Sequence, residues 1–271
     1  MNKKVILIIL IIVLISISII FVYLSNYKLE TENILSQVSN GSKWAKIFVH
    51  SPRNIKEVTK NQKIKGIVTN SLWEIEEAKG NGFVVYSMIS TGNISKIYRC
   101  DEFGNCSHRN LTEEIESGKV YSSLKSETKY LAENGVDGII FDEEIVFIGM
   151  NASQFNDLRN LAKGINSNIL VGLVEFRTDI FVDFLNAGAK PDFIQGEWYS
   201  YHERNNFTEL KELALQYSIK SAYWIVGPQN SEGLKSTLNY SNKTYEELDG
   251  IIFFESGKYW NEVEKIVNSF G

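Results

Sequence analysis

Four carboxylates in two short stretches are the side chains of this chain best suited to acid–base chemistry. Asp142, Glu143 and Glu144 follow directly after a short apolar run, and Glu197 stands near the end of another. Crowded carboxylates repel one another, which raises the pKa of one member of the group. A carboxylic acid of raised pKa can protonate a leaving oxygen while a second carboxylate acts as base, nucleophile or charge stabiliser. The pattern therefore predicts cleavage of a glycosidic bond.

Further acids and aromatic side chains stand where other strands are predicted to end. Aromatic rings with polar edges suit the apolar faces of sugar rings. The side chains expected to bind substrate are Tyr86, Glu175, Trp198, Tyr199, Glu255 and Trp260. Two of them also have structural interpretations, because Glu175 can pair with Arg177 and Glu255 can cap the last helix. His50 and His202 are interpreted as structural or solvated residues, and Trp224 as a core residue.

The acid cluster can also be interpreted as a cation site, because three hard oxygen donors can bind calcium. Calcium takes about six to eight oxygen ligands, and the sequence has no EF-hand-type loop. A zinc site is disfavoured, because His108 is the only imidazole near Cys100 and Cys106 and about four ligands are required. We therefore expect neither a metal nor a cofactor.

The elements that must position these side chains form a regular alternation. Strands are predicted at 45–50, 64–70, 83–89, 136–144, 168–175, 192–199, 221–226 and 250–255. Helices are predicted at 54–60, 72–79, 120–133, 152–163, 179–186, 208–217, 245–248 and 259–269. Such alternation favours a parallel sheet. Eight units fit a single (β/α)8 TIM barrel of the α/β class, whose strands deliver their C-terminal ends to one mouth. An open doubly wound sheet usually has a Gly-rich loop after its first strand, and 49–53 contains no glycine.

The stretch from Gly138 to Glu143 resembles the Gly-hydrophobic-hydrophobic-hydrophobic-Asp-Glu motif on the fourth strand of spherulin-4-like barrels. That family includes glycoside hydrolases that act on galactosamine-containing polysaccharides. The resemblance implies that Asp142 and Glu143 are catalytic, together with Glu197 on the sixth strand. It also implies an exported polysaccharide hydrolase that needs no metal.

The same stretch is similar to the chitinase-like signature Asp-x-x-Asp-x-Asp-x-Glu. Asp137, Asp142 and Glu144 match it, but Ile140 replaces the second Asp, and 195–197 lacks the expected Met-x-Tyr. This resemblance implies that Glu144 is the acid and that Asp142 orients an N-acetyl group. The departures favour the spherulin-like assignment.

The two resemblances differ on whether Glu143 or Glu144 faces the site. Side chains alternate along a strand, so adjacent residues cannot both point inward while the strand stays regular. Glu144 shares a face with Asp142 and Ile140, whereas Glu143 shares one with Phe141. Both glutamates remain candidates.

The first 24 residues form a separate segment. Lys3 and Lys4 precede an apolar run, 5–24, that is interrupted only by Ser16 and Ser18. About 20 apolar residues cross a bilayer, and the lysines are expected to stay in the cytoplasm. We predict an uncleaved signal anchor, with a cleaved signal as the alternative. Residues 25–43 would be a stalk, and 44–271 would be the barrel domain outside the cytoplasm.

An insertion is predicted at 90–116, between the third strand and its helix. It contains Cys100 and Cys106, which can form a small disulfide outside the cell, with two free thiols as the alternative. Asn-x-Ser/Thr sequons suggest a glycoprotein. They begin at Asn40, Asn93, Asn105, Asn110, Asn151, Asn206, Asn239 and Asn242.

The net charge of -5 argues against a nucleic-acid partner, which would favour a basic face. The leading hypothesis is a membrane-anchored, monomeric glycoside hydrolase that cuts an amino-sugar polysaccharide. A second hypothesis is a catalytically inactive barrel that binds glycans or scaffolds a surface layer. A third is a hydrolase that uses the carboxylates as cation ligands.

Overall fold

The computed structural model of the chain contains two compact units, Met1–Ser42 and Lys43–Gly271. The described residues all belong to the second unit. They are 44–52, 54–89, 98–100, 106–108, 119–142, 150–174, 178–199, 202–203, 207–226, 231–254 and 256–270. The predicted anchor (1–24) and stalk (25–43) lie outside them. Within the described residues, no helix combines the length and the apolar character that a membrane crossing requires.

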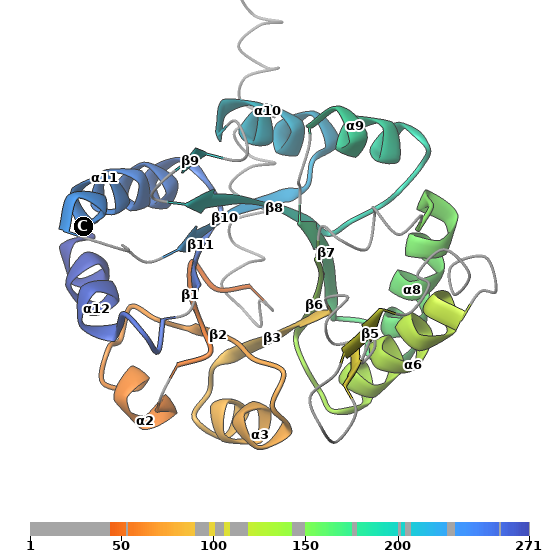
Figure 1. Cartoon of the computed structure of the whole chain (residues 1–271), viewed down its shortest axis with the longest axis horizontal. Helices are drawn as coiled ribbons and strands as arrows, with labels where there is room; N and C mark the ends of the chain where they lie inside the picture. Colours follow the sequence, from red (N-terminus) through yellow and green to blue (C-terminus); the bar gives the residue numbers. More distant parts are fainter. Residues whose placement is uncertain are drawn as a thin grey trace, which may run out of the picture. The chain divides into compact units, whose positions relative to one another are not determined.

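Eight parallel strands close into a barrel, which confirms the predicted fold class (Figure 1). In barrel order they are β1 (Ile47–His50), β2 (Gly66–Val68), β3 (Val84–Ile89), β6 (Gly138–Phe141), β7 (Leu170–Val174), β8 (Phe193–Tyr199), β10 (Lys220–Val226) and β11 (Gly250–Phe254). The circuit closes because β11 pairs with β1 and β10 pairs with β8. A short strand, β9 (His202–Glu203), adds to β8 in the antiparallel sense.

Within the described residues one helix follows each barrel strand, and these helices form a ring outside the strands (Figure 1). They are α2 (Ile55–Val58), α3 (Leu72–Gly80), α6 (Lys119–Glu133), α8 (Ala152–Ile165), α9 (Thr178–Asn186), α10 (Phe207–Tyr217), α11 (Ser231–Glu247) and α12 (Trp260–Ser269). An antiparallel pair, β4 (Tyr98–Cys100) and β5 (Cys106–His108), lies inside the predicted insertion.

The prediction was wrong for α11, which the sequence suggested only over 245–248. The helix begins at Ser231 and runs for 17 residues. Its buried side chains include Thr237, Ser241 and Thr244. Two of these hydroxyls donate to backbone carbonyls four residues earlier, Ser241 to Thr237 at 2.7 Å and Thr244 to Tyr240 at 2.9 Å. A face made of such hydroxyl residues packs inward while looking polar in the sequence.

Successive side chains of each strand point alternately into the barrel and towards the helices, so the core has two parts. One set of apolar side chains packs between strands and helices, and the other fills the lumen of the barrel. Trp44 closes the N-terminal end of the lumen, where its ring lies 5.7 Å from that of Phe48 and 5.2 Å from that of Phe193. Glycines on neighbouring strands make room for these rings. A Cβ on Gly172 would lie 2.2 Å from the Phe193 ring.

Three aspartates tie the strands together at the same end. Each stands directly before a strand and accepts a hydrogen bond from a backbone N–H of the adjacent strand. The pairs are Asp137 with Val85 at 2.9 Å, Asp192 with Val171 at 2.9 Å and Asp249 with Ser221 at 2.8 Å. These carboxylates therefore stabilise the register at the end of the barrel opposite the predicted site.

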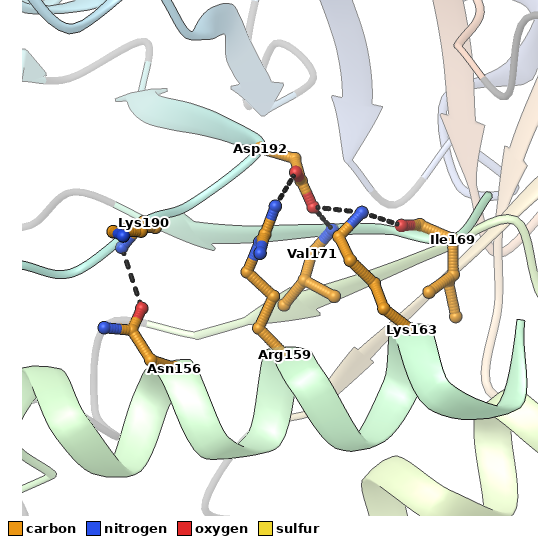
Figure 2. A network of polar contacts seen from close by, with 7 residues as sticks. All are labelled: Asn156, Arg159, Lys163, Ile169, Val171, Lys190 and Asp192. Carbon is orange, nitrogen blue, oxygen red and sulfur yellow. Dashed lines mark hydrogen bonds and ion pairs between the residues drawn. The ribbon is translucent and has the colours of Figure 1, made fainter. Parts of the chain in front are cut away.

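Asp192 forms the most extensive of these networks (Figure 2). Its carboxylate lies 2.7 Å from Arg159 and 3.1 Å from Lys163, both on α8. Lys163 also donates to the carbonyl of Ile169 at 2.7 Å. The network joins α8 to β7 and β8 and fixes this helix against the barrel.

Candidate active site

Asp142 leaves β6 on the lumen side of the barrel. Ile140 belongs to the lumen cluster, whereas Phe141 packs between strands and helices, with its ring 5.8 Å from that of Phe155. The N–H of Asp142 donates to the carbonyl of Ile89 at 3.0 Å, so the strand pairing extends to this residue. The alternation then assigns Asp142 to the same face as Ile140.

Glu197 lies on the lumen face of β8. Phe193 belongs to the lumen cluster and Ile194 to the outer one, so Glu197 shares a face with Phe193. Its side chain is only 6% exposed. Across the strand pair, its register partner is Trp224 on β10, which also belongs to the lumen cluster.

The register places Asp142 and Glu197 at the same level of the barrel. Alternate strands of a (β/α)8 barrel supply each layer of four lumen side chains, because the strands are tilted. The uppermost layer whose four members are all described contains Asn70, Asp142, Glu197 and Phe254. The layer beneath contains His50, Met88, Val174 and Trp224. Asp142 and Glu197 are therefore neighbours in one layer at the C-terminal end of the barrel.

Aromatic contacts agree with this layering. His50 and Trp224 share the second layer, and their rings lie 5.7 Å apart. Phe254, one layer higher on the strand next to β1, stacks on His50 with centroids 4.6 Å apart and planes inclined by 17°. The two carboxylates thus lie above a floor of packed rings.

His50 is a neutral ring at physiological pH. Burial lowers the pKa of its imidazole to about 4. Its Nε2 lies 3.4 Å from the hydroxyl of Ser51. Its Nδ1 is buried and has no hydrogen-bond partner among the described residues.

Two more buried polar groups in the lumen have no partner within the described part of the chain. They are Trp224 Nε1, in the layer of His50, and both amide atoms of Gln195, one layer deeper. Gln195 is completely buried. Such buried polar groups usually make a hydrogen bond to a ligand or to an ordered water.

Tyr86 does not lie at the end of its strand, as the sequence had suggested. It is the third residue of β3, fully buried, with its ring 4.8 Å from that of Phe48 and 5.5 Å from that of Phe193. The ring occupies space left by Gly138, where a Cβ would lie 2.6 Å from it. Tyr86 therefore fills the lower lumen, and burial raises the pKa of its hydroxyl well above the ordinary value.

Three other predicted residues lie on described helices or strands. Trp260 begins α12 and packs, partly buried, against the core between strands and helices. Trp198 and Tyr199 end β8, where their backbones pair with β9. Four predicted residues lie outside the described part: Glu143, Glu144, Glu175 and Glu255.

The predicted disulfide is compatible with the backbone pairing of the insertion. Cys100 on β4 and Cys106 on β5 are direct register partners of each other. Opposed Cα atoms in an antiparallel pair are about 4.5–5.5 Å apart, within the range that a disulfide spans. The bond itself remains a prediction. No group of three or more metal-binding side chains occurs among the residues that the structure describes.

Trp224 was interpreted as core, and the structure confirms that it is a buried core residue. The sequence interpretation did not place the rings of His50 and Trp224 side by side on the lumen face. The alternation of side chains along β1 and β10 was the signal available, because both residues stand on the lumen face near the C-terminal ends of these strands.

Comparison with known proteins gives fold-level similarity only. No protein-family model matches the chain, and no curated protein matches it. Among solved structures, PA4992 of Pseudomonas aeruginosa, a proposed aldo-keto reductase, has a TM-score of 0.52 at 9% identity, covering 82% of this chain and 88% of that one. A variant of the glycoside hydrolase domain of PelA from Pseudomonas aeruginosa has a TM-score of 0.49 at 10% identity, covering 79% and 96%. The Nostoc punctiforme debranching enzyme has a TM-score of 0.49 at 9% identity, covering 79% and 70%.

The similarity to PA4992 supports the barrel architecture. Barrels of this kind carry many unrelated activities, so the activity has to be argued from the residues of the site.

Proposed function

We propose that this protein is a glycoside hydrolase that cleaves an amino-sugar polysaccharide with carboxylates at the C-terminal mouth of the barrel. The observation that carries the proposal is the position of Asp142 and Glu197 in one lumen layer, at the end of the barrel where such enzymes place their chemistry. Neither is part of the aspartate network that supports the opposite end.

In this proposal, a glutamate after β6 protonates the glycosidic oxygen, while Asp142 and Glu197 serve as base, nucleophile or charge stabiliser. Glu143 and Glu144 both remain candidates for the proton donor, as the two family resemblances imply. The rings beneath the carboxylates suit an apolar sugar face.

The test is release of reducing ends from partially N-acetylated galactosamine and glucosamine polymers. Asp142, Glu143, Glu144 and Glu197 are each replaced by the amide. The variant that has an amide in place of the proton donor should still cleave substrates with an activated leaving group, since such leaving groups need little protonation. Loss of cleavage with retained polymer binding supports the enzyme. Binding by the wild type without cleavage of any such polymer would favour an inactive glycan-binding barrel, and loss of cleavage on chelation would favour a cation-dependent hydrolase.

We also propose that residues 1–24 anchor the protein in a membrane with the barrel outside the cytoplasm. The support is the apolar run 5–24 after two lysines. Protease added to intact cells should digest the barrel, and the full chain should remain in the membrane fraction after a high-salt wash. Protection of the barrel from protease would contradict this orientation.

A further inference from the structure

The imidazole of His50 occupies a position that packing alone does not explain. It lies on the lumen face at the end of β1, directly below the layer of Asp142 and Glu197. Its ring is stacked on Phe254 and lies beside Trp224. A phenyl ring would fill the same space without bringing polar atoms into the lumen, where an unpaired polar group is unfavourable.

The polar edges of this floor lack partners. Within the described residues, neither His50 Nδ1 nor Trp224 Nε1 makes a hydrogen bond, and both atoms are shielded from bulk solvent. Leaving such a group unpaired is unfavourable, because its hydrogen bond to water is lost and not replaced. Since the two rings lie 5.7 Å apart and are inclined by 36°, we expect the two nitrogens to share a partner that is not part of these strands.

The backbone holds the ring in a fixed place. The carbonyl of His50 accepts hydrogen bonds from both the N–H of Ser256, at 3.1 Å, and its hydroxyl, at 2.8 Å. Ser51 has a φ of 47°, a conformation uncommon for residues other than glycine. Its N–H donates to the carbonyl of Val68 at 3.0 Å. Uncommon backbone conformations persist where the surrounding structure enforces them, often beside functional groups.

We propose that His50 is a binding residue of the site, and that its Nδ1 and Trp224 Nε1 together hold one hydroxyl group beneath Asp142 and Glu197. The hydroxyl belongs to the substrate sugar or to a water in its place. The indole N–H can only donate, so the hydroxyl oxygen accepts from Trp224 and its proton is donated to Nδ1. Nε2 then carries the proton of the imidazole. The inference rests on the proposed glycoside hydrolase function.

Three substitutions of His50 test the assignment. His50→Phe keeps an aromatic ring against Phe254 and removes both nitrogens. His50→Asn keeps a polar atom near the position of Nδ1, whereas His50→Gln keeps one near Nε2. We expect kcat/KM on galactosamine-containing oligosaccharides to fall about 10–100-fold in His50→Phe, to recover in part in His50→Asn and not to recover in His50→Gln. The melting temperature of His50→Phe should equal or exceed that of the wild type.

Each outcome decides the assignment. Wild-type activity in His50→Phe, or recovery in His50→Gln but not in His50→Asn, overturns it. Calorimetric titration of the oligosaccharide in the Glu197→Gln background separates the two sources of the hydroxyl. Binding weakened by His50→Phe identifies a substrate hydroxyl, whereas unchanged binding with reduced turnover identifies a water. If the wild type cleaves nothing, the proposed function itself fails, and that result is distinct from an active enzyme indifferent to His50.

Discussion

Glu197 and Trp224 are register partners across β8 and β10, and both are buried on the lumen face. Glu197 is only 6% exposed, and a carboxylate with so little water around it is costly to keep charged unless it is paired and hydrogen-bonded. Its place in one layer with Asp142, at the C-terminal end of the barrel, is the reason to test both residues for a role in chemistry.

Replacing these carboxylates by amides is expected to remove activity and to leave the fold intact. Glu197→Gln and Asp142→Asn should each lower kcat by about 100-fold to 10,000-fold, the usual contribution of acid–base groups. Kinetics on an amino-sugar polymer and a melting curve measure the two properties. Glu246→Gln on the exposed side of α11 is the matched control and should change neither. Unaltered kcat in Glu197→Gln would remove that residue from the mechanism.

Asp192 is expected to matter for stability and not for chemistry. Asp192→Ala leaves the N–H of Val171 and two cations without their carboxylate, which should lower the free energy of unfolding by about 2–4 kcal/mol. Denaturant unfolding measures the loss. Glu247→Ala breaks the exposed pair with Lys211, at 3.1 Å, and should cost less than about 1 kcal/mol. Equal losses in the two variants would contradict the role given to this network.

Gly172 is expected to tolerate no side chain, because its Cβ position lies 2.2 Å from the ring of Phe193. Gly172→Ala should destabilise the barrel by about 1–3 kcal/mol or more through overpacking. Gly164→Ala in α8 is the control, since nothing lies within 4 Å of a Cβ there. It should leave stability unchanged or raise it by up to about 1 kcal/mol. Combining Gly172→Ala with Phe193→Leu should recover part of the loss, and thermal unfolding of all three variants checks the expectation.

His50 is expected to make stability depend on pH in a mildly acidic window. Its folded-state pKa of about 4 lies below the ordinary value of 6.5, so the unfolded chain binds the proton first as the pH falls. Stability from this source is complete above pH 6.5 and declines as the pH falls to about 4, by about 3 kcal/mol in total. Denaturant unfolding of wild type and His50→Phe at several pH values isolates the effect from the nearby Asp142 and Glu197. A parallel pH dependence in both proteins would show that His50 does not contribute.

The sequence by itself determined the order of the elements and the ends of the strands that carry the acids. Apolar runs such as 138–141, bounded by turn residues and alternating with helical segments, are a local signal, and the eight strands and the closed barrel follow from it. The 17-residue α11 was mostly missed, because Thr237, Ser241 and Thr244 are among its buried residues and interrupt the apolar pattern on its inner face.

Only the tertiary structure decided which strand-end residues meet. Tilt and register bring Asp142 and Glu197, 55 positions apart in the sequence, into one layer, and they put His50 and Trp224 directly beneath. The same register pairs Tyr86 with Gly138 on the next strand. Since Gly138 has no side chain, the ring of Tyr86 packs in the lumen and does not lie at the mouth of the barrel. Layering depends on how far each strand slides against its neighbour, which is a property of the closed barrel and of no single segment.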